Sequence, residues 1–161
     1  MLIEMTVKGL TVDPFTNTPI IILKDTQGSR VLPIWVGVFE ANAISQQIEN
    51  VSSSRPMTHD LLRNVIVDLD GSVERVVVSD LRGNTFYAII HLLVRGERVA
   101  IDARPSDAIA LALRTRSPIL VEEAVIDSAR TIDVNPERAD SDRLQQWLEG
   151  LDPDTLGRYK M

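Results

Sequence analysis

The chain has 161 residues, 44% of them hydrophobic and 25% charged, which is the composition of one globular domain, alone or with a small appendage. It has no cysteine, and this excludes disulfides, thiolate metal sites and a cysteine nucleophile. The formal net charge of −6 argues against a broad basic face for gripping nucleic acid. No apolar run approaches the roughly 20 residues of a membrane-spanning helix, and the N-terminus lacks the pattern of a signal peptide, so we expect a cytoplasmic protein.

The first third of the chain is predicted to form a meander of antiparallel strands. Residues 2–13 alternate as a long strand, in which Gly9 is predicted to be a bulge. The next segment is dense in Asp, Pro and Asn and indicates a turn. Two further apolar runs, 20–25 and 28–36, are typical of strands.

The apolar period then changes from two to three and four, which predicts two helices. The first begins near Gly37 and the second runs from about Thr58 to Leu69. The residues expected on the buried face of the first helix are Ala41, Ile44, Ile48 and Val51. Those expected on the buried face of the second are Leu62, Ile66 and Leu69, flanked by Leu61 and Val65.

A second meander is predicted over 72–102, with a hairpin turn at Arg82-Gly83-Asn84. The segment 105–114 is apolar on every side and predicts a central buried helix. Residues 118–129 indicate a strand that turns into a short helix. We therefore predict an α+β fold, with antiparallel or mixed β meanders and helices packed on and between them, over residues 1–130, and a helical C-terminal extension over 131–161.

Common catalytic signatures are absent from the sequence. There is no P-loop, Rossmann glycine fingerprint, GxSxG elbow or HExxH motif. The two histidines, His59 and His91, cannot form a three-histidine zinc site. His91 lies within an apolar strand and is predicted to be a packed or edge residue without a chemical role.

Two helix starts concentrate charged side chains, and a structural interpretation accounts for them. Thr58 can cap the second helix, and Asp60 in its first turn suits the positive end of the helix dipole and can pair with Arg55. Beside the central helix, acidic and basic groups are costly unless they are paired, so a salt-bridge cluster would account for them. The members of that second group are Asp102, Arg104 and Asp107.

A functional interpretation uses the same residues as a site. Helix starts attract anions, arginine binds phosphate through two donors, and histidine can carry a proton near neutral pH. Glu40 lies one turn before Ile44, at the edge of the apolar stripe of the helix that begins near Gly37, so three helices carry candidate groups. If the three helix ends converge, their groups suit metal-assisted phosphodiester cleavage, in which carboxylates hold Mg²⁺ or Mn²⁺. The residues alone leave both interpretations open.

Three blocks of the sequence, "LPIWVGVFEANAI", "RPMTHDLL" and "DARPSDAIALALR", closely resemble those of the bifunctional nuclease domain family. The resemblance covers about residues 2–130. It implies the α+β fold of that family, a dimeric assembly, and nuclease activity on both RNA and DNA. The charged residues that fall within the matching blocks are Glu40, Arg55, His59, Asp60, Asp102, Arg104 and Asp107.

The leading hypothesis is a cytoplasmic, metal-dependent nuclease. Its predicted proton carrier is His59, and its predicted phosphate clamp is Arg55 with Arg104. The predicted ligands of Mg²⁺ or Mn²⁺ are Asp60, Asp102, Asp107 and Glu40. The acidic net charge favours small or single-stranded substrates that enter a local pocket. The alternatives are a non-enzymatic dimeric binding or assembly module whose charged cluster is structural, and a sensor of small anions or nucleotides.

Overall fold

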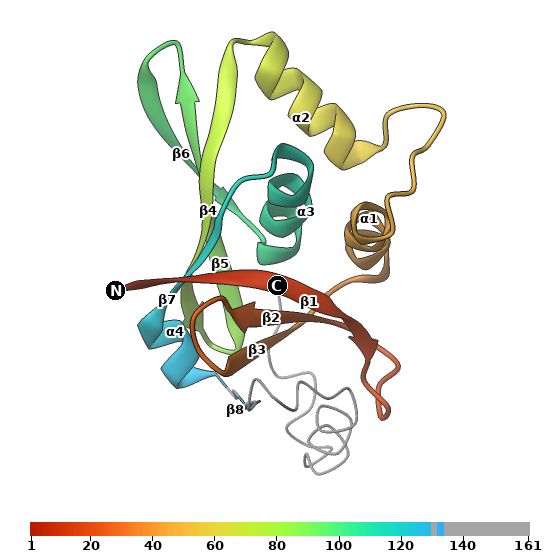
Figure 1. The fold of residues 1–161 in the computed structure, drawn as a ribbon, viewed down its shortest axis with the longest axis vertical. Helices are drawn as coiled ribbons and strands as arrows, with labels where there is room; N and C mark the ends of the chain where they lie inside the picture. The colour runs from red at the N-terminus through yellow and green to blue at the C-terminus, as the bar shows by residue number, and fades with distance from the viewer. Residues whose placement is uncertain (130–131, 134–161) are drawn as a thin grey trace.

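One mixed β-sheet with helices packed against it makes up the part of the chain that the structure describes (Figure 1). The structure is a computed structural model that describes residues 1–129 and 132–133. The strand order is β6-β5-β4-β7-β1-β2-β3-β8. The strands are β1 (Leu2–Val12), β2 (Pro19–Asp25), β3 (Arg30–Trp35), β4 (Gly71–Arg82), β5 (Thr85–Val94), β6 (Glu97–Ala103), β7 (Ile119–Glu122) and β8 (Ile132–Asp133). The helices are α1 (Val38–Ile48), α2 (Thr58–Asp68), α3 (Pro105–Thr115) and α4 (Glu123–Ser128).

The two predicted meanders and the α+β class are confirmed. β1, β2 and β3 pair antiparallel, as do β4, β5 and β6. β7 joins the two meanders, since it runs antiparallel to β1 and parallel to β4. The predicted bulge is present, because the register of β1 against β2 shifts between Val7 and Gly9. The predicted helical extension over 131–161 lies outside the described residues, apart from β8.

Local chemistry fixes the turns that shape this sheet. Gly83 and Asn84 have φ angles of +54° and +64°, the left-handed pair that a two-residue hairpin turn requires. At the end of β1, the buried carboxylate of Asp13 accepts hydrogen bonds from the Phe15 N–H at 2.8 Å and from the Trp35 indole N–H at 2.8 Å. The second bond joins the β1–β2 turn to the last residue of β3, just before the chain enters α1.

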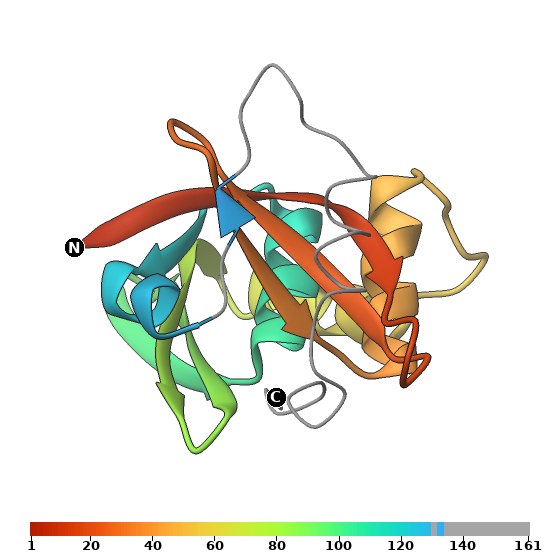
Figure 2. The same ribbon diagram turned by 90° about the horizontal axis from the view of Figure 1, so that it is seen from below.

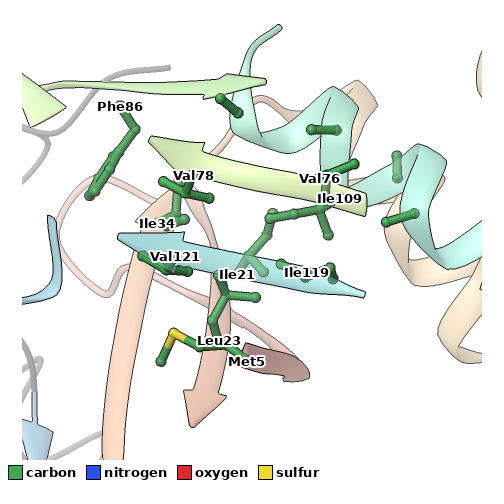
Figure 3. Close-up of a cluster of buried hydrophobic side chains, with 14 of the residues drawn as sticks. Met5, Ile21, Leu23, Ile34, Val76, Val78, Phe86, Ile109, Ile119 and Val121 are labelled. Carbon is green, nitrogen blue, oxygen red and sulfur yellow. The ribbon is translucent and has the colours of Figure 1, made fainter. Parts of the chain in front are cut away.

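α3 is the central helix, as predicted. It contacts α1, α2, β4 and β5. Figures 1 and 2 both place it between α1 and the strands β4 and β7. Figure 3 shows Ile109 of α3 among Val76 of β4 and the apolar side chains of neighbouring strands. Ile109 and Leu111 are both 0% exposed. Each such side chain contributes about 1.5–3 kcal/mol relative to leaving it exposed, so burial holds α3 in place against the sheet.

The predicted buried stripe of α2 is wrong. None of the residues of this helix is buried, and Leu62 and Leu69 are 37% and 57% exposed. α2 contacts α3 and β4 at one side, and only Ile66 of the predicted stripe packs against the core. The helix is amphipathic as predicted, but the described part of the chain supplies no layer that covers its apolar face.

Candidate active site

The first turns of three helices converge at one place, although they are far apart in the sequence. Glu40 lies in the first turn of α1, His59 in the first turn of α2, and Asp107 in the first turn of α3. Arg104 is the residue that precedes α3, and it adopts an extended conformation before Pro105 starts the helix. The convergence that the functional interpretation required is therefore present.

These four side chains form a continuous chain of charged hydrogen bonds, which we call the Glu40–His59 cluster (Glu40, Arg104, Asp107 and His59). Arg104 donates from Nη2 to Oε1 of Glu40 at 2.7 Å and from Nε to Oδ2 of Asp107 at 2.9 Å. The other oxygen of Asp107, Oδ1, lies 2.8 Å from Nε2 of His59. Asp107 thus joins a guanidinium to an imidazole.

Charge and burial set the protonation of this cluster. The hydrogen bond from His59, together with that from Arg104, holds the pKa of Asp107 below its ordinary value against the opposing effect of burial. The hydrogen bond to Asp107 in turn raises the pKa of Arg104. Asp107 is therefore a carboxylate at neutral pH. When Nε2 of a neutral His59 donates to it, Nδ1 is the unprotonated nitrogen that can accept a proton.

The cluster separates two hollows in the surface. A hollow of about 280 Å³ is lined by all four members together with Phe39, Asn42, Ala43, Gln46, Met57 and Thr58. A larger, mostly apolar groove of about 590 Å³ is lined by residues of α2, β5, β6 and α3, and His59, Arg104 and Asp107 line it as well. The side chain of Arg104 is 50% exposed and that of Glu40 is 15% exposed. Of these two groups, the guanidinium is therefore the more accessible to a molecule in the hollow.

Asp60 is part of a separate, structural ion pair. Arg114, whose side chain is 0% exposed, donates from Nε to Oδ1 of Asp60 at 2.7 Å, and also to the carbonyls of Ala43 and Ala110. Oδ2 of Asp60 accepts the Met57 N–H at 3.0 Å and so caps α2. Burial alone would raise the pKa of Asp60, but these hydrogen bonds outweigh it and hold the pKa below its ordinary value.

This arrangement corrects two local predictions. Met57, not Thr58, is the N-cap residue of α2, and Asp60 pairs with Arg114 instead of Arg55. Sequence reasoning missed Arg114 as a partner altogether. The available signal was the cation that follows the uninterrupted apolar run 108–113 of this helix, because a cation there is costly to bury unless an acid meets it.

The two remaining predicted site residues lie outside the hydrogen-bonded cluster. Asp102 is an exposed residue of β6, and it lines the apolar groove near His59 and Arg104. Arg55 is exposed in the loop before α2, and it lines a polar hollow of about 350 Å³. That hollow and the smaller one at the cluster share Gln46, so Arg55 flanks the site at a neighbouring position.

The predicted metal ligands do not form one donor set. Both oxygens of Asp60 accept hydrogen bonds, and the guanidinium of Arg104 lies between the carboxylates of Glu40 and Asp107. Among residues 1–129 and 132–133, no group of three or more His, Cys, Asp or Glu side chains is arranged to hold a metal ion. A divalent cation bound by Glu40 and Asp107 would have to displace Arg104, so the described residues do not fit a metal ion at this cluster.

Known proteins match the chain over most of its length. Residues 21–133 match the model of the bifunctional nuclease domain family. A protein of Mycobacterium tuberculosis (strain H37Rv) that is named as uncharacterized is 38% identical over 160 residues, 94% of this chain and 96% of the relative. Bifunctional nuclease 2 of Arabidopsis thaliana is 30% identical over 119 residues, 70% of this chain and 36% of the relative. Bifunctional nuclease 2 of Oryza sativa subsp. japonica is 28% identical over 135 residues, 81% of this chain and 42% of the relative. The chain thus spans less than half the length of these plant relatives.

Proposed function

The chain belongs to the bifunctional nuclease domain family, and from this premise we propose that it is a nuclease that hydrolyses phosphodiester bonds of RNA, DNA or both at the Glu40–His59 cluster. The observation that carries the proposal is the hydrogen-bonded chain built from three converging helix starts. Such a chain holds a guanidinium and an imidazole in fixed positions at the wall of a hollow. A phosphate-binding group next to a proton carrier is what cleavage of a P–O bond needs.

Each member of the cluster has a role in the proposed reaction. Nε and Nη2 of Arg104 are engaged by Asp107 and Glu40, so Nη1 remains to bind a phosphate oxygen and to stabilise the charge that develops on it. His59 takes the proton of the attacking hydroxyl or water while Asp107 keeps the imidazole oriented. As the new P–O bond forms, the P–O bond to the leaving oxygen breaks and that oxygen takes a proton from water. Glu40 acts by positioning Arg104.

We propose a single-stranded substrate. The net charge of −6 disfavours wrapping around a duplex, and the hollows at the cluster are local. With a neutral His59 the cluster itself carries one net negative charge, because two carboxylates flank one guanidinium. Binding of a phosphate therefore depends on close contact with Arg104 and not on long-range attraction. Arg55, in the adjoining hollow, is placed to contact a second phosphate of the same strand.

The dependence on Mg²⁺ or Mn²⁺ stays a prediction. The argument for it is charge, since a cation would offset the negative charge of the cluster when a phosphate enters. The argument against it is the position of Arg104 between the two carboxylates. Cleavage is measured with Mg²⁺, with Mn²⁺ and with EDTA. Cleavage that EDTA abolishes supports a metal-dependent reaction, and cleavage that persists in EDTA supports a reaction without a metal.

The test is cleavage of end-labelled single-stranded RNA and DNA by the purified full chain. The Arg104→Ala variant, purified in parallel, controls for a contaminating nuclease. The proposal expects cleavage by the wild type that the variant lacks. Equal cleavage by both preparations, or none by either under all three metal conditions, would overturn it.

We also propose that the chain is a homodimer and that it is cytoplasmic. Dimerisation is supported by the exposed apolar side chains of α2 and of the edge strand β6, which form one surface beside the groove. The exposed apolar side chains of this surface include Leu61, Leu62 and Val65 of α2 and Val99 and Ile101 of β6. The cytoplasmic location is supported by the cysteine-free composition and is tested by imaging a fluorescent fusion. Of the helices that the structure describes, none has the length and apolar character needed to cross a membrane.

A second candidate function is a dimeric binding module whose charges are structural. The observation that favours it is that every acid of the cluster is already paired, as is Asp60 with Arg114. This alternative expects no cleavage, and it expects Asp107→Ala to lower the melting temperature. Absence of cleavage is the result that separates the two functions, because the lowered pKa of Asp107 gives this carboxylate a stabilising effect under both.

A further inference from the structure

An exposed aromatic side chain stands beside the Glu40–His59 cluster. Phe39 precedes Glu40 in the first turn of α1 and is 87% exposed. Phe86, by contrast, is 2% exposed and belongs to the core. Phe39 lines the hollow of about 280 Å³ together with His59 and Arg104. Its ring is therefore available to a molecule that enters this hollow.

The same face of α1 carries two amide side chains that follow Phe39. Positions 39, 42 and 46 are spaced by three and four residues, so they lie in a row along one side of the helix. Asn42 and Gln46 both line the hollow with Phe39. The row leads from the cluster to the neighbouring hollow, because Gln46 also lines the space that contains Arg55. An aromatic face, two amides and a guanidinium thus border one cavity.

This combination suits a nucleotide. A nucleobase has an apolar π face that stacks on aromatic rings, and polar edges that pair with amide donors and acceptors. The phosphate attached to it needs a guanidinium close by. A cavity of about 280 Å³ is near the lower end of the usual range for small-molecule sites, roughly 300–1,000 Å³, so it has room for one base and not for a paired duplex.

We propose that Phe39 is the stacking platform for an unpaired nucleobase next to the scissile phosphate, with Asn42 and Gln46 along its edge. This inference rests on the proposed nuclease function and adds the group that selects the substrate. Bases in a duplex are stacked on each other and cannot present a face to Phe39. The residue therefore gives a physical reason for a preference for single strands, separate from net charge.

The experiment compares the full-length wild type with Phe39→Ala, Phe39→Tyr and a matched control, Phe15→Ala. Phe15 is 49% exposed in the β1–β2 turn and does not line the hollow. The substrates are a labelled single-stranded RNA, a labelled single-stranded DNA and the same DNA with abasic positions. We expect Phe39→Ala to weaken binding of the intact strands about tenfold, and to raise KM by a similar factor with kcat nearly unchanged. Phe39→Tyr and Phe15→Ala keep the wild-type values, and the abasic strand binds equally to all four proteins.

The outcomes separate this inference from the proposed function, because binding is measured by anisotropy whether or not cleavage occurs. Cleavage with a KM unaffected by Phe39→Ala overturns the stacking role and leaves the nuclease intact. Binding that depends on both Phe39 and the bases, without any cleavage, supports the stacking role and overturns the nuclease. A change in sedimentation coefficient caused by Phe39→Ala overturns the inference, since it would mean that the ring contacts a second copy of the chain.

Discussion

Nε2 of His59 lies 2.8 Å from Oδ1 of Asp107, although 48 residues separate the two positions in the sequence. The contact joins the first turn of α2 to the first turn of α3. It also places an imidazole and a guanidinium on the two oxygens of one carboxylate, because Arg104 bonds the other oxygen. This relationship makes His59 the residue on which the proposed chemistry depends most directly.

Replacing His59 by Ala is expected to lower kcat on single-stranded RNA by about 100-fold or more, the usual contribution of a positioned general base. The matched control is His91→Gln, since His91 is half-buried in β5 and lines neither hollow at the cluster. Single-turnover cleavage rates measure the effect, and circular dichroism verifies that both variants are folded. Equal rates for the two variants would remove His59 from the reaction.

Replacing Arg114 by Ala is expected to destabilise the fold by about 3 kcal/mol, because it leaves the Asp60 carboxylate without its buried partner. For a chain of this size that loss lowers the melting temperature by about 10 °C. The control is Arg98→Ala, whose side chain is 84% exposed and whose loss is expected to change stability by about 0.5 kcal/mol or less. Thermal unfolding followed by circular dichroism compares them, and similar melting temperatures would contradict a structural role for the buried pair.

The lowered pKa values of Asp60 and Asp107 predict a loss of stability in acid. Because each pKa is lower in the folded than in the unfolded state, the unfolded chain takes up protons first as the pH falls. The contribution of both carboxylates is complete above about pH 5, and it is lost as the pH falls through the unfolded value of about 3.9 toward the lowered folded values. Urea unfolding measures the free energy of unfolding from pH 6 to pH 3. We expect this free energy to depend less steeply on pH in the double variant, Asp60→Asn with Asp107→Asn, than in the wild type. A pH dependence in the double variant as steep as that of the wild type would contradict the prediction.

The sequence predicted the features that depend on neighbouring residues. The hairpin at Gly83-Asn84 follows from a dipeptide that adopts positive φ angles, and the central position of α3 follows from its apolar surface on every side. The bulge at Gly9 was likewise predicted from a single residue and its neighbours in the strand. In each case the physical cause lies within a few residues, so the pattern along the chain is sufficient.

The sequence could not predict the features that depend on how helices are placed relative to each other. Arg114 and Asp60 are 54 residues apart, and only the packing of α2 against α3 decides that they meet. The amphipathic pattern of α2 showed which face is apolar, but not whether the same chain covers it. The salt bridge between Arg104 and Asp107 was predicted, because the two lie three residues apart. The contacts of Asp107 with His59 and of Arg104 with Glu40 were not, because they depend on how the three helices are placed.

Gly37→Ala is expected to displace Glu40 from Arg104. A Cβ atom on Gly37 would collide with the Glu40 carboxylate, which can move because it is the end of a flexible side chain. The backbone of Gly37, with φ −71° and ψ 158°, accepts alanine, so stability is expected to change by about 1 kcal/mol or less. We expect kcat/KM for cleavage to fall to the level of Glu40→Gln. The double variant, Gly37→Ala with Glu40→Gln, is expected to have the same kcat/KM as either single variant. Additive losses in kcat/KM would show that Gly37 and Glu40 act independently.

The exposed face of α2 predicts how the chain assembles. Leu61 and Val65 are 56% and 46% exposed, and they lie one turn apart on the helix beside the apolar groove. If this surface joins two copies, a charge placed on it has to be buried without a partner, which costs several kcal/mol at the interface. We therefore expect the wild type to sediment as a dimer at micromolar concentration, and Leu61→Glu with Val65→Glu to sediment as a folded monomer. The control is Val12→Glu, because Val12 is 50% exposed at the end of β1 and lies outside this surface. A wild type that sediments as a monomer, or a dimer that persists with both charges in place, would mean that another partner or surface is involved.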